Sequence, residues 1–114
     1  YDAAQAIIAS GDFPEAVFCA NDQMAIGFIK AMKEHGLRAP DDIAIVGFDD
    51  IRIGQYMQPT LSTISASRFL WGMTAATWLF DYLESAQLPE LLRIPTAFIP
   101  RESSLKNPVL LSTD

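Results

Sequence analysis

The sequence is poor in the residues on which several common functions depend. Among its 114 residues it has one cysteine, Cys19, and one histidine, His35. A single cysteine forms no internal disulfide, which fits a reducing, cytoplasmic compartment. The histidine stands near no serine that could complete a charge-relay triad, and no cluster of His, Cys and Asp has metal-ligand spacing. We therefore expect no enzyme active site, no metal and no cofactor.

Positive charge and long apolar runs are also scarce. The chain has 8 Lys and Arg against 14 Asp and Glu, a net charge of −6, and its basic residues are scattered. Because recognition of a phosphate backbone needs clustered basic side chains, this segment is not expected to bind nucleic acid directly. No apolar run approaches the roughly 20 residues that cross a bilayer. The chain opens without Met on "YDAAQAII", which does not resemble a signal peptide, so we expect a segment of a longer, non-membrane protein.

Half of the residues are hydrophobic, and their spacing predicts an α/β fold. We expect helices at 2–10, 22–35 and 68–86, and strands at 16–20, 43–48, 61–65 and 94–100. The strand at 16–20, the helix after it and the strand at 43–48 form a βαβ unit, so these two strands should be parallel neighbours. Their apolar runs predict buried strands. The whole pattern predicts part of a doubly wound parallel sheet.

The helix at 68–86 is apolar around nearly its whole circumference. Its central sequence is "FLWGMTAATWLFDYL", residues 69–83. A helix of this kind is buried on several sides, and a thin sheet does not cover it. We expect its partners to lie outside this chain, or in a second copy of the chain.

A polar pair follows each of the two parallel strands. Asn21-Asp22 comes after the first strand and Asp49-Asp50 after the second. Because ligands of open parallel sheets bind beyond the carboxyl ends of the strands, both pairs are expected at one edge. An amide beside a carboxylate suits the hydroxyl groups of a sugar or nucleoside. The alternative is structural: Asn21 or Asp22 caps the helix, and the two later acids form turns.

Residues 14–51, "PEAVFCANDQMAIGFIKAMKEHGLRAPDDIAIVGFDDI", resemble the lactose/galactose-repressor family of bacterial transcription regulators. The pattern continues through "PTLSTI" at 59–64, Gly72 and "IPTAFIPRES" at 94–103, and so covers nearly the whole chain. Members of that family combine an N-terminal helix-turn-helix with a two-lobed effector domain like a periplasmic sugar-binding protein. The chain resembles only the C-terminal part of that domain. Operator DNA would then be contacted only through an N-terminal head that is absent here.

The resemblance implies a division of the chain into three segments. Residues 1–65 would form the C-terminal lobe with its hinge crossover. Residues 66–93 would form a helix of the N-terminal lobe, and residues 94–102 a strand that returns to the C-terminal lobe. The helix at 68–86 would then pack on the N-terminal lobe, which accounts for its excess of apolar residues.

The resemblance also implies an effector site. Asn21 matches the asparagine of the family's A-N-D motif, and Asp49 matches the first aspartate of its G-F-D-D motif. Both positions commonly hydrogen-bond the effector in that family, whereas Asp50 is expected to order the loop after it. Beyond "STI" the family often has a glutamine that touches ligand. Ala66 stands there instead, so Arg68 is expected to take part.

The resemblance further implies a homodimer. The positions that match family dimer contacts are Ile26, Ile29, Lys30, Tyr56 and Met57. Ile26 also lies off the main apolar stripe of its helix, beside Lys30, which indicates an exposed apolar contact.

The predicted function is thus effector binding and dimerisation within a DNA-binding transcription regulator of the cytoplasm. The effector would be a sugar or a nucleoside-like molecule. The alternative is a periplasmic sugar-binding protein of a transporter, which has the same fold. The sequence upstream of this segment distinguishes them, because a regulator carries a helix-turn-helix there and a transporter protein a signal peptide.

Overall fold

The computed structural model describes residues 1–87 and 93–106. Its elements, in chain order, are α1 (Asp2–Ser10), β1 (Ala16–Phe18), α2 (Asp22–Glu34), β2 (Ala44–Phe48), the 3-10 helix η1 (Arg52–Tyr56), β3 (Ser62–Ala66), α3 (Arg68–Ser85) and β4 (Thr96–Ile99). Every predicted helix and strand is therefore present, with shifted ends. The helix η1 occupies part of the stretch between β2 and β3, for which no regular element was predicted. Residues 88–92 of the segment 66–93 lie outside the described residues.

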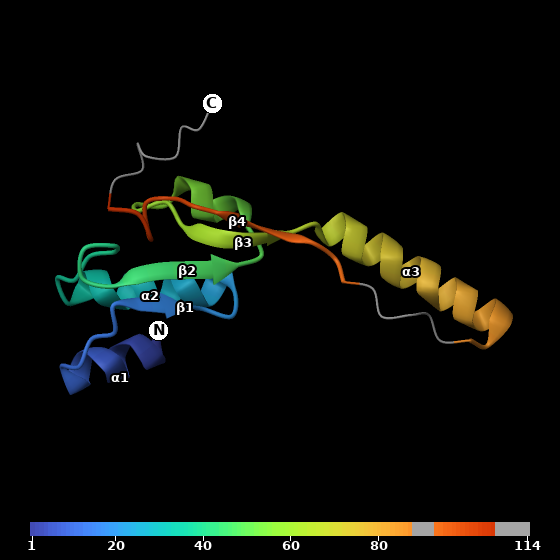
Figure 1. The fold of residues 1–114 in the computed structure, drawn as a ribbon. Helices are drawn as coiled ribbons and strands as arrows, with labels where there is room; N and C mark the ends of the chain where they lie inside the picture. Colours follow the sequence, from blue (N-terminus) through green and yellow to red (C-terminus); the bar gives the residue numbers. More distant parts are fainter. Residues whose placement is uncertain (88–92, 107–114) are drawn as a thin grey trace, which may run out of the picture. The chain divides into compact units, whose positions relative to one another are not determined.

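The four strands form one sheet in the order β1-β2-β3-β4 (Figure 1). β1 pairs in parallel with β2, with Val17 opposite Ile45. β2 pairs in parallel with β3, with Gly47 opposite Thr63. The predicted βαβ unit is confirmed, and β3 adds a third parallel strand to it.

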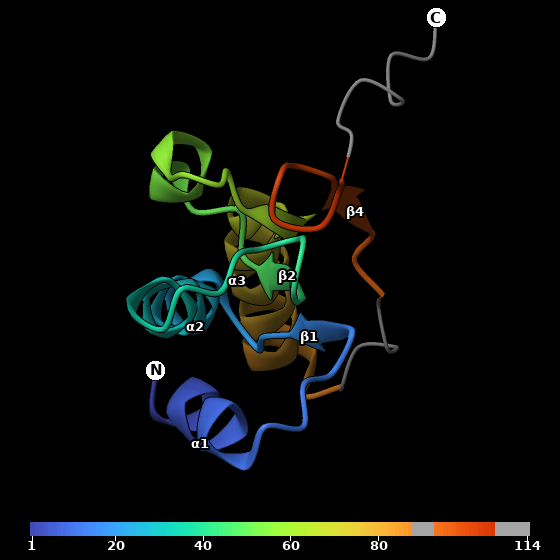
Figure 2. The same cartoon turned by 90° about the vertical axis from the view of Figure 1, so that its left-hand side faces the viewer.

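One face of the sheet carries the helices. α2 packs on β2 and α1 packs on α2, and Figure 2 shows both helices on the same side of β1 and β2. Side chains alternate along a strand, so positions 45 and 47 face α2, with the side chain of Ile45 pointing toward it. Between sheet and helices lies the core, whose largest fully buried apolar side chains are Met32, Ile43, Ile45 and Leu61.

The opposite face of the sheet is less covered. Phe18 in β1 is 62% exposed, and Val46, Phe48 and Ile64 on the neighbouring strands are half-buried. The prediction of a buried strand at 16–20 is therefore wrong for most of that segment. β1 stands at the end of the strand order and pairs with β2. Cys19, directly after β1, is buried as expected of a small apolar side chain.

The chain divides into two compact units. The first comprises Tyr1–Ser65 and the segment from Phe98 onward, and it contains the core. The second is Ala66–Ala97 and contains α3. None of the residues of α3 is buried, and Phe69 is 77% exposed. Although α3 is apolar, no helix of the described residues has the length and hydropathy needed to span a membrane.

Candidate functional site

The carboxyl ends of β1 and β2 bring the two predicted polar pairs to one edge of the sheet. Asn21 and Asp22 follow β1, and Asp49 directly follows β2. The carboxylate of Asp22 joins the two segments, because its Oδ2 accepts a hydrogen bond from the backbone N–H of Ile51 at 2.8 Å. The segments therefore lie side by side, as the parallel pairing of β1 and β2 predicts.

Asn21 is the N-cap of α2. Its Oδ1 accepts a hydrogen bond from the backbone N–H of Met24 at 2.8 Å, which identifies Asn21 rather than Asp22 as the cap. Its Nδ2 donates to no protein atom among residues 1–87 and 93–106. The oxygen of this amide thus serves the helix, and the nitrogen is the group that can donate to a ligand. The structural and the ligand-binding interpretation of Asn21 are compatible.

Asp49 and Asp50 both have a left-handed backbone, with φ of 111° and 49°. Aspartate tolerates positive φ better than bulkier residues, but each such residue still carries conformational strain. The backbone N–H of Asp49 donates to the carbonyl of Ile64 at 3.0 Å, which continues the pairing of β2 with β3. Its half-buried carboxylate forms no hydrogen bond or ion pair within the described part of the chain. Asp49 therefore has an acceptor available for a ligand.

The carboxylate of Asp50 binds within the protein. Its Oδ1 accepts a hydrogen bond from Nη2 of Arg101 at 2.7 Å, and both side chains are largely buried. Nη1 of Arg101 donates to the carbonyl of Leu61 at 2.8 Å. The carboxylate of Asp50 thus links the start of the loop after β2 to the segment that follows β4, and its role in ordering that loop stays a prediction. An arginine reaches both acceptors because its donors are arranged as a fork.

Asp22 is the residue of this edge whose role the sequence analysis missed. It is 1% exposed, and its Oδ1 accepts a hydrogen bond from the hydroxyl of Thr63 at 2.6 Å. Gly47 gives it room, since a Cβ at that position would lie 2.2 Å from the same oxygen. One sequence signal could have indicated the contact. Ser62 and Thr63 are polar residues in a short strand, and buried polar groups need partners.

Arg68, the third predicted effector residue, belongs to the second unit. It is the first residue of α3, directly after the cap residue Ser67, and its side chain is exposed. Asn21 and Asp49 belong to the first unit, so the role of Arg68 as an effector contact stays a prediction.

The predicted dimer contacts lie on α2 and at the end of η1. Tyr56 is 68% exposed and Lys30 is exposed, whereas Ile26 and Met57 are half-buried. Ile29 is different, because it belongs to the core at 2% exposure. Its role as a dimer contact stays a prediction. Ile29 contributes to the lining of a hollow of about 280 Å³ with Ile26, Lys30 and Met57.

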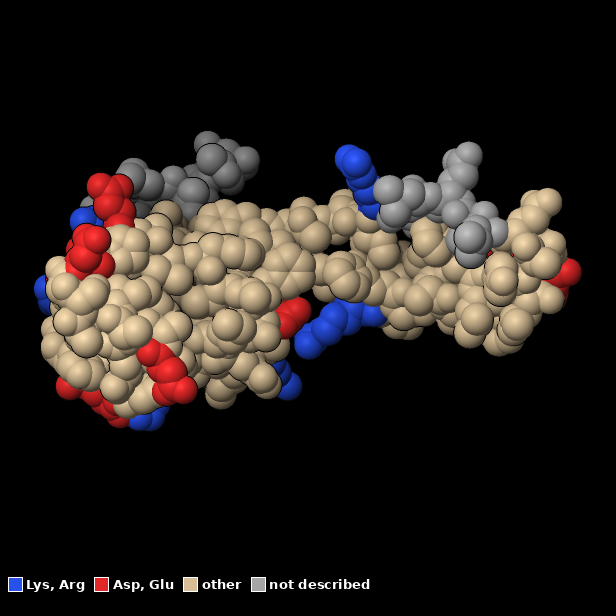
Figure 3. Space-filling view, turned by 90° about the horizontal axis from the view of Figure 1, so that it is seen from below, with Lys and Arg blue, Asp and Glu red and all other residues tan. Residues whose placement is uncertain are grey.

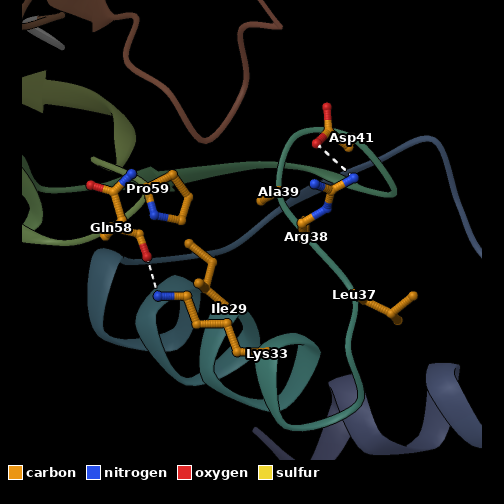
Figure 4. A pocket seen from close by; sticks show the side chains of 8 residues that line it. All are labelled: Ile29, Lys33, Leu37, Arg38, Ala39, Asp41, Gln58 and Pro59. Carbon is orange, nitrogen blue, oxygen red and sulfur yellow. Dashed lines mark hydrogen bonds and ion pairs between the residues drawn. The ribbon is translucent and has the colours of Figure 1, made fainter.

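A second hollow of about 220 Å³ shares Ile29 and Lys33 with the first. In Figure 4 the ammonium group of Lys33 donates to the carbonyl of Gln58, and Arg38 pairs with Asp41 at 3.3 Å. The remaining lining residues are Leu37, Ala39 and Pro59. Because its cations already have partners, this hollow is a poor anion site. It extends the apolar surface beside the predicted dimer contacts.

Lys30, one of those predicted contacts, is held in place by its neighbours. It forms an ion pair with Glu34, and its ammonium group lies 5.0 Å from the centre of the Tyr1 ring. The hydrogen bond between Lys30 and Glu34 raises the pKa of the lysine and lowers the pKa of the glutamate. On the face drawn in Figure 3, acidic and basic side chains are interspersed over the first unit. That face therefore has no basic patch of the kind that binds phosphates.

Cys19 and His35, the single cysteine and the single histidine of the chain, both lie in positions that do not favour catalysis. Burial raises the pKa of the Cys19 thiol, which makes it a weak nucleophile. Nδ1 of His35 lies 2.9 Å from the carbonyl oxygen of Ala31, at the end of α2. In residues 1–87 and 93–106 no group of three or more His, Cys, Asp or Glu side chains could hold a metal ion.

Comparison with known proteins places these features in a family. The model of the periplasmic binding protein-like domain matches residues 1–104. The chain is 44% identical over 81 residues to the HTH-type transcriptional repressor PurR of Pasteurella multocida, which covers 71% of this chain and 24% of the relative. It is 38% identical over 106 residues to the lactose operon repressor of Rhizobium radiobacter, which covers 93% of this chain and 94% of the relative. The chain spans 24–31% of the length of the first curated relatives.

Solved structures show the same likeness. A lac repressor dimer bound to operator and the anti-inducer ONPF superposes with a TM-score of 0.84 at 30% identity, over 92% of this chain and 37% of that chain. A LacI-family transcriptional regulator from Enterococcus faecium with bound ribose gives a TM-score of 0.72 at 30% identity, over 89% of this chain and 39% of that chain. The fold of these regulators is therefore the fold of the present chain.

Proposed function

The chain belongs to the lactose/galactose-repressor family, through its periplasmic binding protein-like domain, and we propose that it binds the effector and forms dimer contacts within a transcriptional regulator. The observation that carries the proposal is the edge of the sheet at which the segments after β1 and β2, which carry Asn21 and Asp49, are joined by the Asp22–Ile51 hydrogen bond. Residues 1–65 would belong to the C-terminal lobe and its hinge, residues 66–93 to the N-terminal lobe, and residues 94–102 to the returning strand. The protein would act on operator DNA in the cytoplasm through a separate head.

The chemistry of the edge supports a hydroxyl-rich effector. The amide nitrogen of Asn21 is a donor, and the carboxylate of Asp49 accepts from hydroxyl groups. Sugars and nucleosides carry neighbouring hydroxyls that can do both. One relative of known structure holds ribose, which is in keeping with this class of ligand. Arg68 is the further effector residue that the family resemblance predicts.

The surface of α2 supports a dimer. Lys30 and Glu34 give it one charge of each sign, and Ile26 and Met57 provide apolar area beside them. A surface of this composition is complementary to itself, as a two-fold interface requires. A lac repressor is a dimer in its complex with operator. Effector in the cleft would then shift the population of lobe arrangements, and with it the spacing of the DNA-binding heads.

The transporter alternative has less support. A periplasmic sugar-binding protein has the same fold, but the two curated relatives named above are transcriptional repressors. The ordered motifs "GFDD", "PTLSTI" and "PRES" also resemble the pattern of the repressor family.

The effector site is tested by two substitutions in the whole protein. Asn21→Asp keeps an oxygen to cap α2 but removes the amide donor, and Asp49→Asn removes the carboxylate charge. We expect each to weaken effector binding about 10- to 100-fold, because each removes a hydrogen bond in a site where charge assists it. The measurement is isothermal calorimetry with the best ligand from a panel of ribose, galactose, cellobiose and adenosine.

The matched control is Tyr56→Ser, on the predicted dimer surface. It should lower the mass seen by sedimentation while each subunit keeps its affinity for the panel ligand. Wild-type affinity in both site variants would remove Asn21 and Asp49 from the site. An unchanged mass for Tyr56→Ser would count against the dimer surface alone.

A further inference from the structure

The loop that carries Asp49 is held by a buried junction beneath it. The residues of the junction come from three separate elements: Asp22 from the start of α2, Gly47 from β2 and Thr63 from β3. The two carboxylate oxygens of Asp22 accept hydrogen bonds from different segments. Oδ1 accepts from the hydroxyl of Thr63 at 2.6 Å, and Oδ2 accepts from the backbone N–H of Ile51 at 2.8 Å.

The hydroxyl of Thr63 contacts the loop as well. While it donates to Asp22, it accepts a hydrogen bond from the backbone N–H of Asp50 at 3.3 Å. Two consecutive backbone N–H groups of the loop, those of Asp50 and Ile51, therefore donate hydrogen bonds to side chains of this junction. The preceding backbone N–H group, that of Asp49, donates a hydrogen bond to the carbonyl of Ile64 in β3.

The polar side chains of the junction are shielded from solvent. Asp22 is 1% exposed and Thr63 is fully buried. Among the described residues no basic side chain pairs with Asp22. Its charge is compensated by the two hydrogen bonds and by its place in the first turn of α2, where the helix dipole favours an anion.

The backbone of the loop needs such a constraint. Asp49 and Asp50 both have positive φ, a conformation that persists only when the surroundings impose it. Without the junction, the loop would relax toward conformations with negative φ, and the carboxylate of Asp49 would point elsewhere. The direction of that carboxylate decides whether it meets a ligand hydroxyl.

We propose that Asp22 and Thr63 are positioning residues for the effector site: their buried junction fixes the 49–51 loop and thereby the carboxylate of Asp49. The proposal rests on the proposed function for its consequence, because only an effector-binding loop needs a fixed carboxylate. The arrangement of the loop itself can be tested without any ligand.

The first measurement is amide hydrogen exchange in the whole protein, resolved by residue. In Asp22→Ala the Ile51 amide loses its acceptor, and we expect it to exchange at least tenfold faster relative to the amides of Ile45 and Cys19. Those two amides bond to backbone carbonyls in the core and serve as internal references. A purely structural role would accelerate all of these amides by the same factor, and that result would overturn the proposal.

Conservative variants separate the hydrogen bonds from the packing. Thr63→Ser keeps the hydroxyl and should leave the exchange of Asp50 unchanged, whereas Thr63→Val keeps the shape and should accelerate it. Asp22→Asn should behave more like the wild type than Asp22→Ala, since its amide can accept from Ile51 and donate to Thr63. If Thr63→Ser and Thr63→Val exchange alike, the hydroxyl does not hold the loop.

Ribose binding then connects the loop to the site. We expect Thr63→Val to bind ribose at least fivefold more weakly than the wild type and Thr63→Ser to bind it equally well, at a temperature where all variants are folded. Glu102→Gln, which alters a polar contact of the same β3 region away from the loop, is the matched control and should bind ribose normally. If the wild type does not bind ribose, the comparison uses whichever of galactose, cellobiose and adenosine it binds. If it binds none of the four, the proposed effector class is wrong while the exchange experiment still decides the role of the junction. Equal ribose binding by Thr63→Val and wild type would overturn the link to Asp49.

Discussion

The two units of the chain differ in the burial of their apolar residues. In the first unit, residues from α1, α2, β2 and the position just before β3 bury one another, and Met32 and Leu61 have no exposed surface. In the second unit α3 is equally apolar, yet Phe69, Phe80 and Leu83 are each more than half exposed. Apolar composition alone therefore does not decide burial. A helix is buried only where other elements supply a surface, and the second unit has no other helix among its described residues.

The largest effect should come from equivalent truncations in the two units. Met32→Ala leaves a cavity in the core and should lower the free energy of unfolding by about 2–5 kcal/mol. Phe80→Ala removes an exposed side chain and should change it by less than about 0.5 kcal/mol. The measurement is urea denaturation of the 114-residue chain, followed by circular dichroism at a concentration low enough for the monomer. Equal losses at both sites under dilution would show that α3 is covered within one chain.

The second effect concerns what covers α3 when the chain is alone. We predict that the 114-residue chain self-associates through α3, because exposed aromatic side chains gain free energy when they leave water. The double variant Phe69→Ser, Phe80→Ser should associate at least tenfold more weakly in sedimentation equilibrium. Phe18→Ser is the control, since Phe18 is similarly exposed but lies in β1. An equal loss in this control would assign the association to the open face of the sheet.

The smallest effect is a pH dependence within the first unit. Hydrogen bonds from the backbone N–H and the hydroxyl of Thr60 hold the pKa of Glu102 below its ordinary value. Because the folded pKa is the lower one, this carboxylate stabilises the fold above the unfolded pKa, and the contribution is lost as pH falls through the folded pKa.

Glu102→Gln should accordingly lower the free energy of unfolding at pH 7 by at most about 1 kcal/mol. The difference from the wild type should vanish at a pH below the folded pKa, which urea denaturation at several pH values will detect. A difference that stays constant with pH would mean that the charge of Glu102 is unimportant. Asp81→Asn, which removes one exposed carboxylate from α3, is the matched control.

Sequence reasoning succeeded where the signals are local. The periodicity of residues 22–35 predicts α2, and the apolar run before Asp49 predicts β2. The order strand, helix, strand then predicts that β1 and β2 are parallel neighbours, because short connections allow few other arrangements. It failed for the burial of Phe18. Burial depends on which faces receive a partner, and that is not a local property.

The sequence by itself determined the order of the elements, the family and the polar residues placed after each parallel strand. Hydrophobic spacing and turn residues act over a few positions, so these signals can be read from neighbouring residues in the sequence. Only the tertiary structure decided how the acids divide their roles. Asp22 meets Thr63 and Asp50 meets Arg101 across 41 and 51 positions of sequence. Asp49 is left with no such partner among the described residues, because folding assigns the donors of distant segments to its two neighbours. The carboxylate available to an effector is thus identified by contacts that no local pattern encodes.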